Sequence, residues 1–213
     1  MTAPIEWRHT EFARVISCTR CTLATDPYLL RDDGENVPQP GYIGSRYKTS
    51  RVLLVGRNPG KTKALVAPDR AYTAALRTLR DDPTPARYKE LTAILREFIP
   101  KWQVHKYFPL EESGLALEDI AYCNIVRCRT SGNAEPCELL AQQCVQDHFK
   151  RWLTLLAPKI VVFVNKAAWT QGYRFVEAKG LPCPFMNGKR SLSHTGRVAN
   201  REAVVALIRQ YRG

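Results

Sequence analysis

Three polar residues stand at or just beyond the ends of apolar, strand-like runs. Asn58 follows the run in RVLLVGRNPG, Asn124 ends the run in DIAYCN, and His194 ends the short segment SLSH. The carboxyl ends of parallel strands meet at one edge of a sheet, where α/β proteins bind their ligands. An amide both donates and accepts hydrogen bonds, and an imidazole can donate to an atom on which negative charge develops. We therefore expect these three side chains to serve one ligand site.

The seven cysteines form a second set of residues that could do chemistry. Cys18 and Cys21 make a C-x2-C pair, and Cys128 and Cys144 are separated by 15 residues. One close pair with two distant thiolates can hold zinc or an iron–sulfur cluster. Buried thiols that bind nothing are the competing interpretation, because cysteine is among the most buried residue types. A disulfide scaffold is not expected in a long chain that lacks a secretion signal.

The charge balance is strongly basic, with 32 Lys and Arg against 20 Asp and Glu and a net charge of +12. A basic folded domain is typical of proteins that bind DNA or RNA, and a solvated basic surface is the alternative. Lys61 and Lys63 follow the Gly-rich turn and can contact phosphate, but the full P-loop spacing is missing, so we exclude a nucleotide P-loop. Three further basic residues flank His194 and are expected to contact phosphate: Lys189, Arg190 and Arg197.

Apolar runs alternate with amphipathic, helix-like segments along the chain. This alternation predicts a mainly parallel sheet with helices on both faces. Residues 37–44, VPQPGYIG, read as a surface turn because they are rich in Pro and Gly. We expect strands at 51–56, 119–128 and 159–165 with a short one at 191–194, and helices at 7–17, 70–80, 86–99, 136–157, 166–178 and 200–212, the last capped by Asn200.

The length of 213 residues suits one α/β domain. Residues 61–118 give the least clear pattern of helices and strands and could hold an insert. No apolar run approaches the roughly 20 residues of a membrane span. The N-terminal residues MTAPIEWRHTEF lack the charged-then-apolar order of a signal peptide. We therefore expect a soluble, cytoplasmic monomer.

In its motifs the chain resembles the iron–sulfur branch (family four) of the uracil-DNA glycosylase superfamily. CTRCTLA is similar to that branch's first cysteine pair, VLLVGRNPG to its first catalytic motif, and AYCNIVRCRTSGN to its Asn-containing strand with the third cysteine. CELLAQQC brings the fourth cysteine after the branch's 15-residue gap, and LLAPKIVVFVNKAAW resembles its next helix–strand–helix passage. SLSHTGR stands where a His-containing second motif belongs. The pieces occur in the expected order and cover roughly half of the chain.

The resemblance implies a fold and a cofactor. The fold would be a three-layer α/β/α sandwich around a four-stranded, mainly parallel sheet, in a single domain over residues 1–213. The cofactor would be a structural 4Fe–4S cluster, with zinc as the alternative, held in part by an N-terminal segment of about residues 1–30. The implied ligands are Cys18, Cys21, Cys128 and Cys144, which leaves Cys123, Cys137 and Cys183 as core or surface thiols.

The resemblance also implies a reaction, which is hydrolysis of the N-glycosidic bond of a base flipped out of DNA. Asn58 and His194 would be catalytic, the first by orienting water or by contacting the base, and the second by stabilising the leaving base. Asn124 would read the edge of the base, and Gly56 would also belong to the substrate-binding residues. Tyr72 is the nearest candidate for the aromatic residue on which the base stacks. No residue pattern indicates a lysine that would form a Schiff base, so we expect no lyase activity and predict a monofunctional glycosylase.

Three features depart from that branch and leave the base open. Asn58 stands where the branch usually has an acidic residue, His194 is followed by Thr195 instead of Pro, and the branch's Pro-Phe-Val-Gly stretch is absent. The base would be uracil or another deaminated base, or else a bulky modified pyrimidine of viral DNA. Other classes also stay open. One is a DNA-binding protein without turnover, including one that traps an abasic site covalently through His194. Another is an iron–sulfur electron carrier, which explains the cysteines but not the charge of +12.

Overall fold

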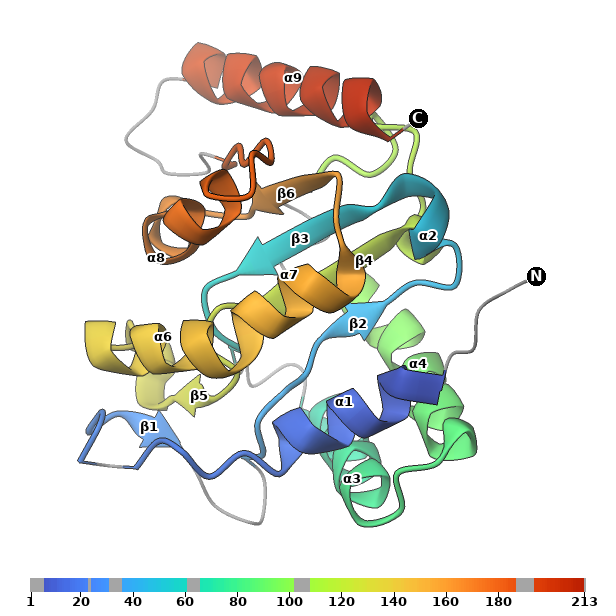
Figure 1. Cartoon of the computed structure of the whole chain (residues 1–213), viewed down its shortest axis with the longest axis vertical. Coiled ribbons are helices and arrows are strands. Elements are labelled where there is room, and N and C mark those ends of the chain that lie inside the picture. The colour runs from blue at the N-terminus through green and yellow to red at the C-terminus, as the bar shows by residue number, and fades with distance from the viewer. Residues whose placement is uncertain are drawn as a thin grey trace. The chain divides into compact units, whose positions relative to one another are not determined.

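The computed structural model describes residues 6–22, 24–30, 36–60, 66–101, 108–186 and 194–212 (Figure 1). The chain forms two compact units. The helical unit comprises Met1–Pro40, Asn58–Phe98 and Val126–Gln143, and the sheet unit comprises Gly41–Arg57, Ile99–Ile125 and Cys144–Gly213. The prediction of a single domain stays a prediction.

The elements follow one another in the alternating order that the sequence predicts. The strands are β1 (Leu29–Leu30), β2 (Tyr42–Ile43), β3 (Val52–Gly56), β4 (Ile120–Asn124), β5 (Arg129–Thr130) and β6 (Ile160–Phe163). The helices are α1 (Glu6–Ile16), α2 (Tyr47–Ser50), α3 (Val66–Asp81), α4 (Pro85–Phe98), α6 (Glu138–Cys144), α7 (Lys150–Leu156), α8 (Lys166–Glu177) and α9 (His194–Tyr211).

The sheet unit contains a four-stranded sheet in the order β2-β4-β3-β6. Strand β3 pairs in parallel with β4 and with β6, whereas β2 pairs antiparallel with β4. Every residue of β3, β4 and β6 is buried, as expected for continuous apolar runs that are covered on both faces. The prediction of an α/β fold with a central, mainly parallel, four-stranded sheet is confirmed.

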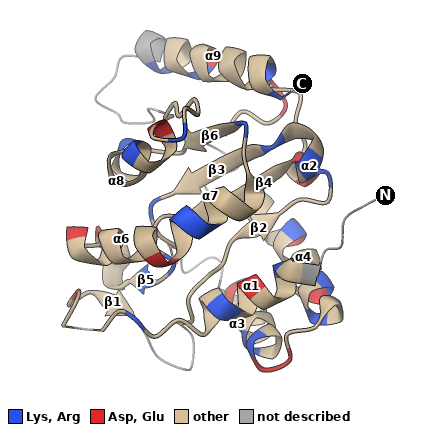
Figure 2. Cartoon of the chain, viewed as in Figure 1, with Lys and Arg blue, Asp and Glu red and all other residues tan. Residues whose placement is uncertain are grey.

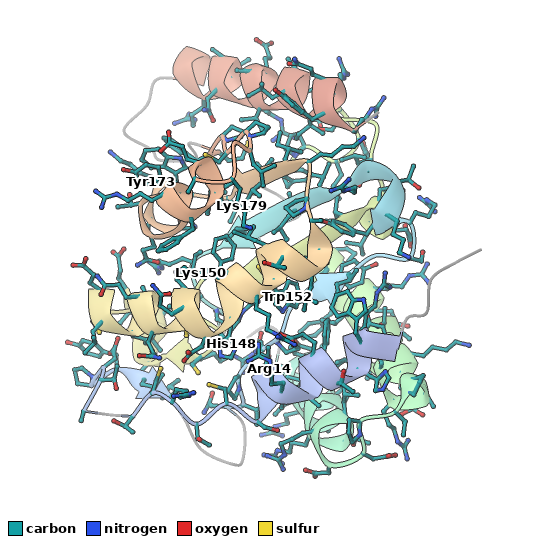
Figure 3. The ribbon with its side chains drawn as sticks, in the orientation of Figure 1. Arg14, His148, Lys150, Trp152, Tyr173 and Lys179 are labelled. Carbon is teal, nitrogen blue, oxygen red and sulfur yellow. The ribbon has the colours of Figure 1, made fainter. Side chains whose placement is uncertain are left out.

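Helices α7 and α8 pack with β6 inside the sheet unit. The ring of Phe149, just before α7, lies 6.4 Å from the ring of Phe163 in β6. A Cβ atom at Gly172 in α8 would lie 2.7 Å from that same ring, so α8 reaches this position only because residue 172 has no side chain. The ammonium of Lys150 lies 4.8 Å from the centre of the Phe175 ring and joins α7 to α8 (Figure 3).

The fourth strand of the sheet corrects the prediction of a surface turn at 37–44. These residues are buried, and Tyr42 and Ile43 pair with β4. Two glycines permit the close approach, because a Cβ atom at Gly41 would lie 2.2 Å from the Tyr122 carbonyl oxygen and one at Gly44 would lie 2.1 Å from that of Glu118. Gly in this segment therefore marks close backbone contact and not an exposed loop.

Two expectations for the C-terminal region were wrong. Helix α9 begins at His194, six residues before the start at residue 200 that we expected, and Asn200 lies inside it instead of capping it. His194 therefore opens a helix and does not end a strand; the rest of the predicted strand, 191–193, lies outside the described residues. Helix α9 is held in the sheet unit by buried Val204 and Ile208, which repeat with helical spacing.

The predicted long helix at 136–157 is present but changes its winding near the middle. Helix α6 ends at Cys144, a π-helical turn covers Val145–Phe149, and α7 follows without a break. Single π turns inserted into α-helices occur frequently at functional sites. The buried side chains His148 and Trp152 lie on and after this turn (Figure 3).

The helical unit has its own apolar core. The ring of Phe12 in α1 meets Tyr88 in α4 edge-on, with ring centres 5.0 Å apart, and Tyr72 in α3 lies 6.0 Å from Phe98 in α4. In the same unit β1 pairs antiparallel with β5, with Leu29 opposite Thr130. These contacts join α1 and α3 to α4, and β1 to β5.

Lys and Arg are spread over helices of both units and are not gathered on one element (Figure 2). Among the described residues, no helix is both long enough and apolar enough to cross a membrane.

Candidate active site

Asn58 comes two residues after the end of β3 and is held by a side chain of the helical unit. Its amide nitrogen Nδ2 donates to the hydroxyl oxygen of Thr130 at 3.0 Å. The Thr130 hydroxyl in turn donates to the carbonyl oxygen of Ala134 at 2.5 Å. Asn58 is partly buried, and Thr130 is only 2% exposed. Asn58 is thus a polar side chain with one arm fixed by a buried partner.

The segment that carries Thr130 is held from two sides. Residue 130 pairs with Leu29 across the β1–β5 ladder, and the Ser131 amide donates to the Tyr28 carbonyl at 2.8 Å. The neighbouring Arg129 forms a buried ion pair with Asp69 of α3. Removing one partner from a buried ion pair is strongly destabilising, so this pair resists displacement of β5.

Asn124 is the last residue of β4 and lies in the sheet unit beside Gly56, its parallel register partner on β3. The hydroxyl of Tyr122 donates to Asn124 Oδ1 at 2.9 Å. A Cβ atom at Gly56 would lie 2.3 Å from that same oxygen, so glycine leaves the room that the amide occupies. Asn124 is 6% exposed. A buried amide with its oxygen fixed by a hydroxyl is suited to recognise a ligand edge by hydrogen bonding.

The structure describes the other predicted site residues to different extents. The backbone of His194 begins α9, and Arg197 follows in the first turn of that helix with a partly exposed side chain. Tyr72 is only 1% exposed and packs on Phe98. Its role as the aromatic residue on which the base stacks stays a prediction. Four predicted phosphate contacts lie outside the described residues: Lys61, Lys63, Lys189 and Arg190.

The four predicted metal ligands are all described. Cys21, Cys128 and Cys144 are buried and Cys18 is partly buried, and none of the seven cysteines forms a disulfide. Cys128 stands between Arg127 and Arg129, which are 0% and 4% exposed. The guanidinium of Arg127 donates to the Pro40 carbonyl oxygen at 2.6 Å, and that of Arg129 pairs with Asp69.

A metal site also requires that the side chains of its ligands converge on one point. Within the described part of the chain, no three His, Cys, Asp or Glu side chains converge into a group that could hold a metal ion. The residue types and their burial fit a cluster, but the side-chain arrangement does not form a metal-binding group. The cluster therefore stays a prediction, and no catalytic step below depends on it.

The three thiols that the resemblance leaves without a metal have ordinary structural surroundings. Cys123 is buried within β4. Cys137 donates through Sγ to the Thr25 carbonyl oxygen at 3.1 Å, while its amide donates to Asp26 at 2.8 Å. Partial burial, with a smaller effect from Glu177, raises the pKa of the Cys183 thiol, which makes this cysteine less reactive at neutral pH.

A parallel sheet with polar side chains at the ends of its central strands defines an α/β protein of the kind that binds ligands at the carboxyl edge of the sheet. The family model of the uracil DNA glycosylase superfamily matches residues 44–208. This match covers more than half of the chain, which therefore belongs to the uracil DNA glycosylase superfamily. Membership gives a glycosylase type of function that acts on DNA. No curated protein sequence matches the chain.

Two residues of the candidate site escaped the sequence analysis. The contact of Tyr122 with Asn124 could have been predicted from sequence, because side chains two residues apart on a strand lie on the same face. Nothing in the sequence indicated that Thr130 contacts Asn58, since the two residues are 72 positions apart in the chain. Only the fold of the helical unit brings Thr130 and Asn58 together.

Proposed function

We propose that the protein is a monofunctional DNA glycosylase that hydrolyses the N-glycosidic bond of a flipped uracil or other deaminated base. The observation that carries this proposal is the buried Asn124 amide at the carboxyl end of β4, inside the stretch that matches the superfamily. A base in a duplex must leave the stack before its glycosidic bond can be reached, at a cost of about a few kcal/mol. A buried amide is where such a base would be recognised.

Breaking the bond produces a sugar with oxocarbenium character and a base with negative charge. The site must therefore hold the base, stabilise its charge and place a water near the sugar. Asn124 would hold the base, because its amide can match a carbonyl and an N–H group. His194 would donate to the oxygen on which charge develops. Its position as the first residue of an 18-residue helix supports this role, because a helix N-terminus favours negative charge.

Asn58 would orient the attacking water. An amide is a weak base, so it cannot remove a proton from water as a carboxylate can. The reaction would then depend on departure of the base, which stabilisation of its negative charge assists. A deaminated base is a better leaving group than an ordinary one because its negative charge is shared with carbonyl oxygens. This supports uracil-like substrates.

The net charge of +12 supports a DNA partner. Five basic residues would contact phosphate: Lys61, Lys63, Lys189, Arg190 and Arg197. Binding through such contacts releases counterions from DNA and weakens as salt increases.

A structural 4Fe–4S cluster on Cys18, Cys21, Cys128 and Cys144 is part of the proposal. Its support is the cysteine spacing and the burial of three of these thiols. When bound, the cluster would join distant segments of the chain and have no part in bond cleavage. Zinc on the same thiolates is the alternative.

Two other functions compete with this one. A glycosylase that removes a bulky modified pyrimidine from viral DNA would use the same residues, and the absence of a Pro-Phe-Val-Gly stretch leaves room for such a base. A protein without turnover, or one that traps an abasic site covalently through His194, would keep the DNA contacts and lose the reaction.

Turnover on oligonucleotides separates these functions. Duplex and single-stranded oligonucleotides would carry uracil, hypoxanthine, thymine opposite guanine, or a hydroxymethylated pyrimidine at one position. Released base is measured by mass spectrometry, and covalent complexes are measured by denaturing gels. We expect release of uracil with an abasic product and no covalent complex. Release of only the bulky pyrimidine would support the antiviral alternative, and tight binding without release would contradict a glycosylase.

A further inference from the structure

The Thr130 hydroxyl stands between two hydrogen bonds, and their directions decide which arm of the Asn58 amide faces it. Thr130 Oγ1 lies 2.5 Å from the Ala134 carbonyl oxygen and 3.0 Å from Asn58 Nδ2. A carbonyl oxygen only accepts, so the single hydroxyl hydrogen of Thr130 goes to Ala134. The hydroxyl can then offer only lone pairs to Asn58. It therefore selects the NH₂ arm of the amide.

Selecting one arm of a planar amide also fixes the other. With Nδ2 directed at Thr130, the carbonyl oxygen Oδ1 of Asn58 is directed away from it. A carbonyl oxygen accepts a hydrogen from water and leaves a lone pair of that water available for attack on the sugar. An NH₂ arm in the same place would donate to the water oxygen and occupy a lone pair. The orientation of Asn58 thus decides whether it helps or hinders a nucleophilic water.

We propose that Thr130 is a positioning residue for the reaction, whose hydroxyl holds Asn58 with Oδ1 presented to the attacking water. This inference rests on the proposed function and names the group that makes an amide sufficient at position 58. Thr130 suits this task because it is 2% exposed and lies in β5, which is held by the β1 ladder and by the Arg129–Asp69 pair. A preorganised partner of this kind costs no reorganisation during the reaction.

A purely structural role for Thr130 makes a different prediction, and two substitutions separate the roles. Thr130→Val keeps the shape of the side chain but removes the hydroxyl. Thr130→Ser keeps the hydroxyl but loses a buried methyl group. If Thr130 has only a structural role, Thr130→Val loses the hydrogen bond to Ala134 and Thr130→Ser loses packing, so any loss of rate follows the loss of stability in both variants. If Thr130 positions Asn58, the rate follows the hydroxyl.

The experiment measures single-turnover base release and DNA binding for wild type, Thr130→Val, Thr130→Ser, Asn58→Ala and the Asn58→Ala/Thr130→Val double variant. Loss of one hydrogen bond that orients a group should lower the rate of Thr130→Val about 3- to 10-fold with DNA affinity unchanged. Thr130→Ser should keep the wild-type rate even where its melting temperature falls. Thr130→Val should have no further effect once Asn58 is Ala, because Thr130 acts only through Asn58.

A second readout does not depend on turnover. In ¹⁵N-labelled protein, the Asn58 side-chain amide hydrogens should exchange faster with water in Thr130→Val than in wild type or Thr130→Ser. Equal rates of base release in wild type and Thr130→Val, or an equal further loss in the Asn58→Ala background, would overturn this inference while leaving the glycosylase intact. A wild-type protein that releases no base from any oligonucleotide would instead contradict the proposed function.

Discussion

Tyr122 and Asn124 stand two residues apart on one face of β4, and the Tyr122 hydroxyl donates to Asn124 Oδ1 at 2.9 Å. This contact fixes the amide so that its oxygen lies against Tyr122 and Gly56. The NH₂ arm is therefore directed elsewhere and is the arm suited to donate to a carbonyl oxygen of a base. Uracil and its deaminated relatives carry such an oxygen.

Tyr122→Phe should relax base selectivity. The ring stays in place while the hydroxyl that orients Asn124 is lost, so the amide can present either arm. A net hydrogen bond is worth about 0.5–1.5 kcal/mol, which corresponds to about a 2- to 10-fold fall in discrimination between uracil and cytosine. The measurement is the ratio of release rates for the two bases. An unchanged ratio would show that Tyr122 does not orient Asn124 for recognition.

Gly56→Ala should impair both stability and recognition. The new Cβ atom would lie 2.3 Å from Asn124 Oδ1 and 2.8 Å from the Tyr122 hydroxyl, so the amide must move. Overpacking of this kind typically costs about 1–3 kcal/mol. Thermal unfolding measures the loss. Gly60→Ala is the matched control for stability, because its Cβ atom would meet Asn133 at an ordinary 3.5 Å. Equal melting temperatures for the two variants would contradict this packing.

The cysteines predict a brown protein that contains iron. Thiolate-ligated iron–sulfur clusters absorb broadly near about 400 nm, so the spectrum and the iron content test the cofactor together. Cys128→Ser should lose colour and iron, because Cys128 is one of the proposed ligands. Cys183→Ser is the control and should keep both. A colourless protein with one zinc per chain would contradict the iron–sulfur assignment and leave the fold unaffected.

Asp119 should make the stability of the sheet unit depend on pH. Partial burial would raise the pKa of its carboxyl, but hydrogen bonds from Arg46 and the Ala116 amide outweigh this and hold the pKa below its ordinary value. A carboxyl with a lowered folded-state pKa contributes stability above its unfolded pKa of about 4 and loses it as pH falls through the folded value.

Asp119→Asn should therefore destabilise the protein at pH 7 and have less effect below about pH 4. The arginine of this pair is largely exposed, so the pair makes only a small contribution to the free energy of unfolding. Urea unfolding of wild type and Asp119→Asn, at pH 7 and below about pH 4, measures the difference in the free energy of unfolding. Glu111→Gln, at an exposed position, is the matched control. A destabilisation that is the same at both pH values would show that charge is not its cause.

The three parallel strands β3, β4 and β6 were predictable because each is a largely apolar run, as is typical of a strand covered on both faces. The edge strand β2 was not, because its place depends on Gly41 and Gly44 lying against β4, which is distant in sequence. His194 was misplaced for a related reason. The alternation in SLSH is too short to outweigh the turns of α9 that follow it.

The candidate site was predictable from sequence to the extent that it depends on strand ends. Asn58 and Asn124 were proposed as site residues because they follow or end buried apolar runs, and their roles stay predictions. The partners that orient them were not identified. Thr130 meets Asn58 only through the fold of the helical unit, and the direction of their hydrogen bond depends on the neighbouring Ala134 carbonyl, which the sequence does not place.

The central claim is that the protein releases a base by hydrolysis and that Asn58 orients the water. Single-turnover release of uracil from an oligonucleotide, compared between wild type and Asn58→Ala at saturating enzyme, tests this claim most directly. We expect wild type to release uracil and Asn58→Ala to do so about 100- to 1000-fold more slowly, as is typical for the loss of one preorganised catalytic group, with DNA binding nearly unchanged. Release of uracil at the wild-type rate by Asn58→Ala would contradict the account.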